Sequence, residues 1–227
     1  EKIRREFTAN VSHELKTPLT TISGYAQMIS NGMAKTEDIK EFGRKIEKES
    51  DRLLTLIDDI INLSNIDEQG SIENPENIDL SLVTEEAICV LEKAAKERGI
   101  QIYYTKIPTF IKGNLTLVSE LVYNLLDNAI KYNKDNGKIT VFVGESAKGV
   151  ELSVKDTGIG IPPEDTERIF ERFYRVDKSH SKKVGGTGLG LSIVKHVCAC
   201  HNATIRVKSK VGKGTTIYVT FPNNVNN

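Results

Sequence analysis

The strongest constraint on the fold is the spacing of apolar residues in the first 69 positions. They recur every three or four residues in two runs, which places each run along one face of an α-helix. The first run is Ile3, Phe7, Val11, Leu15, Leu19, Ile22, Ala26 and Ile29, and the second is Ile39, Phe42, Ile46, Leu53, Leu56, Ile60 and Leu63. The turn-like Ser30-Asn31-Gly32 separates them. The pattern predicts an antiparallel helical hairpin.

A single hairpin cannot cover both of its apolar stripes. Two hairpins that pair into a four-helix bundle bury both, so the sequence predicts a homodimer through this region. Thr36, followed by two acidic residues, predicts the start of the second helix, because a hydroxyl cap and early negative charge suit the free N–H groups there.

The pattern changes after residue 70. Gly70 and Pro75 end the helical region, and residues 71–78 are expected to form a linker. Helices are predicted over 81–98, 114–132 and 190–201, and strands over 100–104, 139–143, 150–154, 204–208 and 215–221. Domains are therefore expected at 1–70 and 79–227, and the second should be an α+β layer with helices on one face of a sheet.

The charge balance restricts the partners. The chain has 31 Lys and Arg against 31 Asp and Glu, which argues against binding nucleic acid or a membrane surface. No apolar run is long enough to span a bilayer, and three cysteines suit reduced thiols of the cytoplasm better than a disulfide framework. The chain begins without Met inside a predicted helix, so we expect a piece of a longer protein.

His13 is the first candidate for chemistry. It is turned about 200° from Val11 on the helix, so its ring is expected to face solvent. An exposed histidine is usually an ordinary surface residue. Here Glu14 is adjacent and Thr17 lies one turn on. A neutral imidazole nitrogen can attack phosphorus while a carboxylate accepts the other ring N–H. Pro18 is expected to interrupt the helical hydrogen bonds just beyond.

A polar face on the predicted helix 114–132 is the second candidate. Asn124, Asn128 and Lys131 lie four and three residues apart and share one side. Such spacing is often only the polar edge of an amphipathic helix. Two amide oxygens can also bind Mg²⁺, which takes oxygen ligands and phosphate oxygens, and a lysine adds a cation for the phosphates.

Two glycine-rich segments complete the set. Asp156 follows a predicted strand, where it can accept the amino hydrogen of adenine and exclude guanine, while Gly158 and Gly160 permit close approach of the base. The same segment can also be an ordinary turn. Gly185-Gly186-Thr187-Gly188-Leu189-Gly190 opens the last predicted helix, whose free N–H groups attract phosphate. It fits neither a P-loop nor a dinucleotide fingerprint.

Taken together, these segments resemble the boxes of bacterial sensor histidine kinases of two-component systems. Residues 7–20 resemble the phospho-acceptor box, 124–132 the N-box, 156–162 the G1 box, 169–175 the F-box and 185–191 the G2 box. The resemblance covers nearly the whole chain in the family's order. It implies a dimerisation and phosphotransfer hairpin followed by a Bergerat-type (GHKL) α/β sandwich.

The resemblance also implies an activity. His13 would accept the γ-phosphoryl group of ATP with Glu14 assisting, and a response regulator receiver domain would then take it on an aspartate. Thr17 would hold water for a phosphatase reaction. The nucleotide and Mg²⁺ would bind Asn124 and Asn128, and the remaining contacts would come from Lys131, Tyr132, Asp156, Gly158, Gly160, Ile161, Gly186, Thr187, Gly188, Leu189 and Gly190. The parent protein would be anchored in the plasma membrane.

Residues 162–187 are interpreted as a mobile lid. Arg172 and Arg175 are its candidates for reaching the γ-phosphate, although an ordinary surface charge explains them equally well.

Two other functions stay open from sequence. An ATP-driven clamp, as in gyrase, Hsp90 and MutL, would need a glutamate where this chain has Asn124, although Glu120 lies one turn earlier. A non-catalytic dimeric interaction module would need no ATP.

Overall fold

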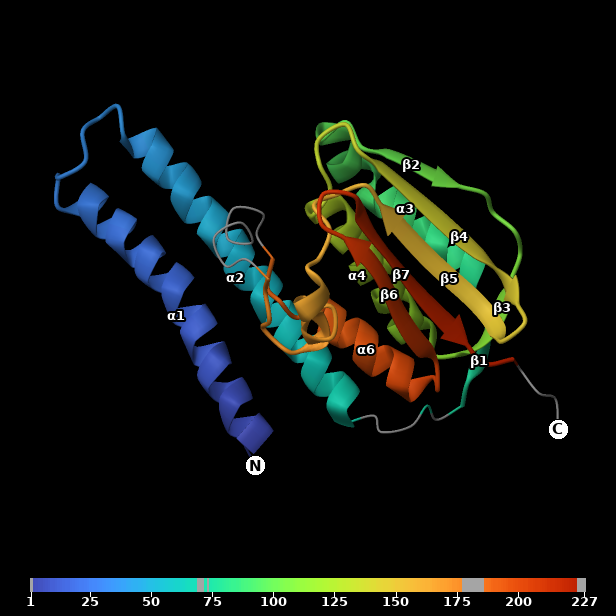
Figure 1. Cartoon of the computed structure of the whole chain (residues 1–227). Coiled ribbons are helices and arrows are strands. Elements are labelled where there is room, and N and C mark those ends of the chain that lie inside the picture. Colours follow the sequence, from blue (N-terminus) through green and yellow to red (C-terminus); the bar gives the residue numbers. More distant parts are fainter. Residues whose placement is uncertain (1, 69–71, 73, 177–185, 224–227) are drawn as a thin grey trace. The chain divides into compact units, whose positions relative to one another are not determined.

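The computed structural model describes residues 2–68, 72, 74–176 and 186–223 (Figure 1). The chain divides into two compact units, Glu1–Ser64 and Asn65–Asn227. The first holds most of a helical hairpin, and the second is a layered α/β unit.

The hairpin confirms the prediction from apolar spacing. Helix α1 spans Lys2–Ser30 and helix α2 spans Ile39–Glu68. The backbone N–H of Phe42 donates to the carbonyl of Asp38 at 2.9 Å, so α2 starts directly after the expected Thr36-Glu37-Asp38 segment. The rings of Tyr25 and Phe42 meet across the two helices with centroids 5.0 Å apart.

Pro18 does not end the first helix, contrary to a simple helix-breaking role. Helix α1 continues through it to Ser30, and the Pro18 ring is buried. Proline lacks the N–H that would bond to the carbonyl four residues earlier, which is that of Glu14. The interruption is therefore local, and it falls beside His13.

The apolar residues of α2 separate into two stripes. Leu56 and Leu63 from the predicted stripe are buried, at 4% and 1% exposure. A second set, Leu54, Ile57 and Ile61, follows helical spacing and stays exposed, at 60%, 38% and 51%. Among the described residues, these three side chains of the second stripe therefore stay open to solvent.

The α/β unit is built on a five-stranded sheet of order β2-β4-β5-β7-β6, with a separate pair β1-β3. Only β2 and β4 run parallel within the large sheet. The elements are β1 (Glu76–Asp79), α3 (Leu80–Glu97), β2 (Gln101–Tyr104), β3 (Phe110–Gly113), α4 (Leu115–Lys131), β4 (Lys138–Ser146), β5 (Gly149–Asp156), 3₁₀ turns at Pro163–Asp165 and Arg168–Phe170, α6 (Gly190–Cys200), β6 (Thr204–Lys210) and β7 (Gly214–Phe221).

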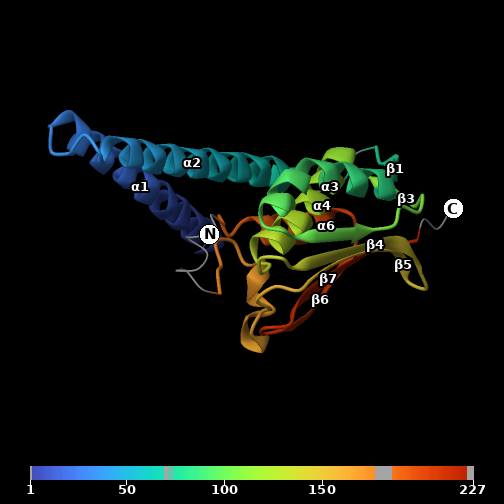
Figure 2. The ribbon, with the colours of Figure 1, turned by 90° about the horizontal axis from the view of Figure 1, so that it is seen from above.

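Helices α3, α4 and α6 cover one face of this sheet, as predicted (Figure 2). Alternate residues of the central strands point toward them, among them Val141, Leu152 and Val219, and are almost fully buried. Leu121 and Leu125 fill the same layer from α4. This layer is the core, and it holds the functional ends of α4 and α6 in place.

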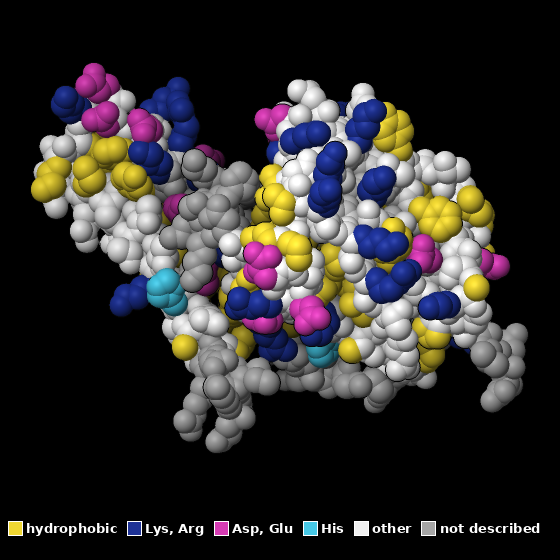
Figure 3. Space-filling model, in the orientation of Figure 1, with side chains coloured by type: hydrophobic (Ala, Val, Ile, Leu, Met, Phe, Trp, Pro, Cys, Tyr) yellow, Lys and Arg dark blue, Asp and Glu magenta, His cyan; other side chains and the backbone are white. Residues whose placement is uncertain are grey.

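The opposite face of the sheet is solvated. Figure 3 shows Lys and Arg side chains spread over it. Arg206 and Lys208 lie over the ring of Tyr218, with charge-to-centroid distances of 5.0 and 5.6 Å, and Arg206 also pairs with Glu151 at 3.2 Å. These cations are largely satisfied by their neighbours on the sheet.

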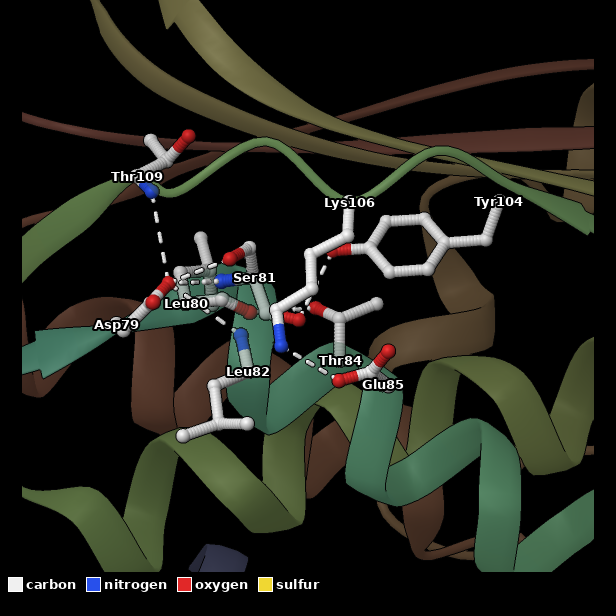
Figure 4. Close-up of polar contacts among 9 residues, drawn as sticks. All are labelled: Asp79, Leu80, Ser81, Leu82, Thr84, Glu85, Tyr104, Lys106 and Thr109. Carbon is white, nitrogen blue, oxygen red and sulfur yellow. Dashed lines mark hydrogen bonds and ion pairs between the residues drawn. The ribbon is translucent and has the colours of Figure 1, made fainter.

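The β1-β3 pair corrects the expected linker. Residues 76–78 of that segment belong to β1, in which Ile78 pairs with Ile111 of the unpredicted strand β3. Asp79 ends β1 and caps α3, because its carboxylate accepts the N–H of Ser81 at 3.0 Å and that of Leu82 at 3.3 Å (Figure 4). Strand β1 reads Glu-Asn-Ile-Asp and holds a single apolar residue, so alternation could not reveal it in the sequence.

Arg98 fixes the end of α4 that carries the N-box. Its guanidinium donates to the backbone carbonyls of Ile130, Lys131 and Asn133, the last two at 3.0 and 2.7 Å. A helix leaves its final carbonyls without partners, and Arg98 satisfies two of them, those of Ile130 and Lys131, together with the carbonyl of Asn133 just beyond the helix.

Candidate functional site

His13 lies in the open on α1. Its side chain is 81% exposed, and Nδ1 is 4.0 Å from Oε1 of Glu14. The prediction that the ring faces solvent is therefore confirmed. A ring in this position presents Nε2 to an incoming group while Nδ1 faces the carboxylate.

The neighbours of His13 are more constrained. Glu14 is 25% exposed, and its Oε2 accepts from Arg52 Nη2 of α2 at 3.5 Å. The Thr17 hydroxyl donates to the carbonyl oxygen of His13 at 3.1 Å. Thr17 therefore has to release this bond before its hydroxyl can donate to a water molecule, although the oxygen can already accept from one.

The two asparagines on α4 both donate from their amide nitrogens to the backbone of their own helix. Nδ2 of Asn124 donates to the Glu120 carbonyl at 2.9 Å, and Nδ2 of Asn128 donates to the Asn124 carbonyl at 2.7 Å. With the nitrogens held by the helix, both Oδ1 atoms are turned away from it. Two oxygen donors one turn apart fit the ligand preference of Mg²⁺.

Lys131 and Tyr132 follow on the same helix end. The Lys131 ammonium lies 2.7 Å from Asp127 Oδ2, an ion pair within the N-box itself. The Tyr132 hydroxyl approaches Gly186, where an added Cβ would come within 2.9 Å of it. The N-box and the G2 box are thus in direct contact.

Asp156 ends β5 in a half-buried position. Its Oδ1 accepts the N–H of Gly158 at 2.7 Å and that of Thr215 at 3.2 Å. Burial raises the pKa of this carboxyl above its usual range, an effect that the two backbone N–H groups oppose. Both of these hydrogen bonds end on Oδ1, so Oδ2 is the oxygen suited to bind an amino group.

The G1 glycines are required by close packing. A Cβ at Gly158 would lie 2.1 Å from the Tyr132 carbonyl oxygen. Gly160 has a φ of +72°, and a Cβ there would lie 2.2 Å from the carbonyl of Lys210. Ile161 is held by its N–H, which donates to Ser209 Oγ at 2.7 Å.

The G2 segment opens α6 against α4. A Cβ at Gly190 would lie 2.6 Å from Asn124 Oδ1. Thr187 is buried, and its Oγ1 accepts the N–H of Leu189 at 3.3 Å. Gly188 has a φ of +78°. Its backbone carbonyl accepts the N–H of Phe173 at 2.9 Å, and this bond links the F-box to the G2 box.

Only part of the expected lid is described. Residues 177–185 lie outside the described residues. Arg172 and Arg175 are half-buried, and they flank Phe173, which has the uncommon φ of +64°. Their proposed reach to a phosphate stays a prediction.

The fold therefore brings three of the sequence segments together. The N-box, the G1 box and the G2 box meet around the C-terminal half of α4, through Asn124, Tyr132 and the glycines that contact them. His13, Glu14 and Thr17 belong to the other unit.

Sequence reasoning missed two contributors. Thr215 reaches Asp156 only because β5 and β7 pair, so no local signal identifies it. Arg52 was also missed, although the sequence offers a usable signal for it. It is a charged residue at an inward-facing helical position, three residues after Glu49 and four before the buried Leu56.

The other histidines and the cysteines have no catalytic arrangement in the described part of the chain. His201 is buried, with Nδ1 on the Val197 carbonyl at 2.8 Å and Nε2 accepting the N–H of Asn114 at 3.2 Å. His180 lies outside the described residues. Burial raises the pKa of the Cys198 thiol to about 12. Among the described residues, no group of three or more His, Cys, Asp or Glu side chains could hold a metal ion.

Two protein families match separate parts of the chain. Residues 3–69 match the His kinase A (phospho-acceptor) domain, and residues 113–225 match the histidine kinase-, DNA gyrase B- and HSP90-like ATPase family. The first match contains His13, and the second contains every nucleotide box named above. Within the described ranges, none of the helices combines the length and apolar composition needed to cross a bilayer.

Individual relatives agree with these matches. The sensor-like histidine kinase SenX3 of Mycobacterium bovis is 38% identical over 224 residues, which are 98% of this chain and 54% of the relative. This chain thus spans about half the length of that curated relative. The solved mycobacterial sensor histidine kinase MprB is 32% identical with a TM-score of 0.56, over 65% of this chain and 97% of that one.

A third relative covers both units. The structure of histidine kinase ThkA in complex with the response regulator protein TrrA has a TM-score of 0.76 over 96% of this chain and 61% of that one, at 24% identity. That likeness concerns the fold, a helical hairpin followed by a GHKL-type α/β unit. From the two family matches and the extent of these similarities, the chain belongs to the sensor histidine kinases of bacterial two-component systems.

Proposed function

We propose that this chain uses ATP to phosphorylate His13 and then passes the phosphoryl group to an aspartate of a response regulator. The observation that carries the proposal is the exposed His13 ring with Glu14 Oε1 4.0 Å from its Nδ1. A second unit of the same chain brings the N-box, G1 and G2 residues together.

ATP is the expected nucleotide because of Asp156. A carboxylate that accepts a hydrogen bond matches the amino group of adenine, whereas the carbonyl oxygen of guanine would leave it unpaired. Gly158 and Gly160 keep the approach to the base free of side chains. The matched ATPase family supports the same choice.

The phosphates are expected at the start of α6. The N–H groups in the first turn of α6, which begins at Gly190, and the positive end of the helix attract negative charge. The amide oxygens of Asn124 and Asn128 would hold Mg²⁺, which neutralises charge on the phosphates. Lys131 would add a cation after loosening its pair with Asp127.

The first chemical step is an in-line displacement. The lone pair of His13 Nε2 attacks the γ-phosphorus, and the bond from that phosphorus to the bridging oxygen of ADP breaks. Glu14 accepts the Nδ1 proton or holds it by a hydrogen bond, so the positive charge that develops on the ring is stabilised. ADP leaves with the bonding electron pair.

The second step needs a partner that carries a carboxylate. A receiver domain would approach His13 on α1, and its aspartate would take the phosphoryl group from Nε2. ThkA was solved with the response regulator TrrA, and we propose a partner of the same class for this chain.

Two further roles belong to the same proposal. Thr17 would orient a water molecule that hydrolyses the aspartyl phosphate of the regulator, which releases inorganic phosphate and restores the carboxylate. The exposed Leu54, Ile57 and Ile61 would pair with a second copy and complete a four-helix bundle.

The test is incubation with radiolabelled Mg-ATP, followed by mapping of acid-labile, base-stable phosphate. We expect label on His13, and His13→Gln should remove it while nucleotide binding stays unchanged. Asn124→Ala should instead weaken nucleotide binding. Steady ATP hydrolysis without labelled protein would contradict the proposal and favour an ATP-driven clamp.

A further inference from the structure

A carboxylate bridge connects His13 to the second helix of the hairpin. Glu14 turns Oε1 toward Nδ1 of His13, at 4.0 Å, and Oε2 toward Nη2 of Arg52, at 3.5 Å. The three groups lie in sequence as imidazole, carboxylate and guanidinium. All of them belong to the hairpin unit, so the arrangement does not depend on the position of the α/β unit.

Arg52 is itself held in place. Its Nη1 lies 3.7 Å from Oε2 of Glu49, one turn earlier on α2. The side chain is 14% exposed, compared with 25% for Glu14 and 24% for Glu49. An ion pair that is partly removed from water keeps its geometry better than a surface pair, because solvent screens it less.

The carboxylate of Glu14 and the guanidinium of Arg52 differ in how firmly their directions are fixed. Glu14 follows His13 on the same helix, where adjacent side chains diverge by about 100° and do not face each other. Its carboxylate must therefore bend toward the ring to reach Nδ1. A guanidinium is planar and always charged, and one of its nitrogens can hold an oxygen of the carboxylate in a fixed direction.

From this geometry we propose that Arg52 is a positioning residue for phosphorylation of His13. By binding Oε2 of Glu14 it directs Oε1 to the Nδ1–H of His13, and it thereby favours the tautomer whose Nε2 lone pair is free to attack. The proposal rests on the function proposed above. It adds a residue of α2 that acts on His13 through Glu14.

The chemistry explains the expected size of the effect. An imidazole with its proton on Nε2 cannot attack through that nitrogen, so every molecule in the wrong tautomer is inactive. A carboxylate that supports the proton on Nδ1 removes this loss and stabilises the positive charge formed during attack. Misplacing such a group by about 1 Å can cost up to about 100-fold in rate.

The kinetic test compares Arg52→Gln and Arg52→Lys with the unaltered chain. For Arg52→Gln we expect the maximal rate of autophosphorylation to fall about 10- to 100-fold with an unchanged KM for ATP. Arg52→Lys should recover part of the rate, because it retains a cation but not the fork. A rate for Arg52→Gln equal to that of the unaltered chain would overturn the proposal.

Two control variants on α2 separate the alternatives. Lys45→Gln breaks the Lys45–Glu41 pair, which is 2.6 Å long and lies on the same helix, and should leave the rate unchanged. Glu49→Gln removes the second partner of Arg52 and should lower the rate less than Arg52→Gln does. An equal loss from Glu49→Gln would assign the effect to Glu49 and would contradict a direct action on Glu14.

A spectroscopic test is independent of activity. In the unphosphorylated chain labelled with ¹⁵N-histidine, the ring signals report the tautomer of His13, and His13→Gln identifies them. We expect the Nδ1–H form in the unaltered chain and a shift toward Nε2–H in Arg52→Gln. The same tautomer populations in both would refute the proposal. If the unaltered chain incorporated no phosphate, the proposed function would fail while this result stayed interpretable.

Discussion

The hairpin and the α/β unit bury their apolar residues to different extents. In the α/β unit, α4 places Leu121, Leu125 and Leu126 at 0–1% exposure against the sheet. In the hairpin, Leu19, Leu54 and Ile61 are all more than half exposed. The α/β unit is complete as a folded layer, whereas the hairpin presents an apolar stripe that a second copy can cover.

This difference matches the division of roles that we propose. A nucleotide site needs fixed groups, and a packed core supplies them at Asn124 and Asp156. A phospho-acceptor must meet two partners in turn, the nucleotide and a receiver domain, and His13 is open to both at 81% exposure.

The largest expected effect tests whether the hairpin needs a second copy. Leu54→Ala with Ile61→Ala should weaken self-association at least about 100-fold, because each dimer loses four large side chains and each contributes about 1.5–3 kcal/mol when fully buried. Analytical ultracentrifugation measures it. Val90→Ala, which removes an isolated apolar residue of α3 that is 71% exposed, is the matched control and should leave the dimer intact. An unchanged dissociation constant in the double variant would contradict the view that the hairpin, unlike the α/β unit, needs a second copy to bury its apolar residues.

The next effect tests the self-sufficiency of the α/β unit. Leu125→Ala should lower its free energy of unfolding by about 2–5 kcal/mol, because a cavity opens in a closed core. Leu115→Ala on the same helix, where the side chain is 44% exposed, should change it by less than about 0.5 kcal/mol. Denaturant unfolding of both variants gives the comparison, and similar values for the two would contradict it.

A third change separates binding from stability within the α/β unit. Asp156→Asn should weaken ATP binding about 10- to 100-fold, since a hydrogen bond to a charged group contributes about 1.5–3 kcal/mol. Burial raises the pKa of Asp156, so its ionised form costs stability at neutral pH, and this cost disappears as the pH falls below the unfolded value of 3.8.

Asparagine keeps an oxygen for the N–H groups of Gly158 and Thr215 and carries no charge. The variant should therefore unfold at the same temperature as the unaltered chain, or higher, at pH 7.5. Calorimetric titration with ATP and thermal unfolding provide the two measurements. Tight ATP binding by the variant would contradict the assigned role of Asp156.

The smallest effect is a pH dependence confined to the α/β unit. Burial lowers the pKa of His201, and protonation would set a second ring N–H against the N–H of Asn114. Stability due to His201 is therefore fully present above its unfolded pKa of 6.5 and declines as the pH falls toward the lowered folded value. Thermal unfolding between pH 8 and 5 should show it, and His201→Gln should flatten the profile.

Much of the fold was predictable because its signals are local. Apolar spacing located α1 and α2, and alternation located β4 and β5. Strands β1 and β3 were missed, since β1 holds a single apolar residue and the pairing of the two strands joins residues more than 30 positions apart. Residues 76–78 were assigned to a linker for the same reason.

The site divides in the same way. Helical spacing alone put Asn124 and Asn128 on one face and predicted the exposure of His13. Thr215 and Arg52 escaped notice because their partners, Asp156 and Glu14, lie 59 and 38 residues away. Distant contacts of this kind leave no periodic signal in the sequence.

The order of the boxes and the two apolar stripes, read from the sequence alone, determined the family, the hairpin and the positions of the reactive groups. This was possible because helical and strand periods are set by backbone geometry within a few residues. Tertiary structure decided which groups meet: the carboxylate of Glu14 between His13 and Arg52, and the convergence of three glycine- and amide-bearing segments on α4. Those contacts depend on how separate helices and strands pack against one another, and no single stretch of the sequence carries that information.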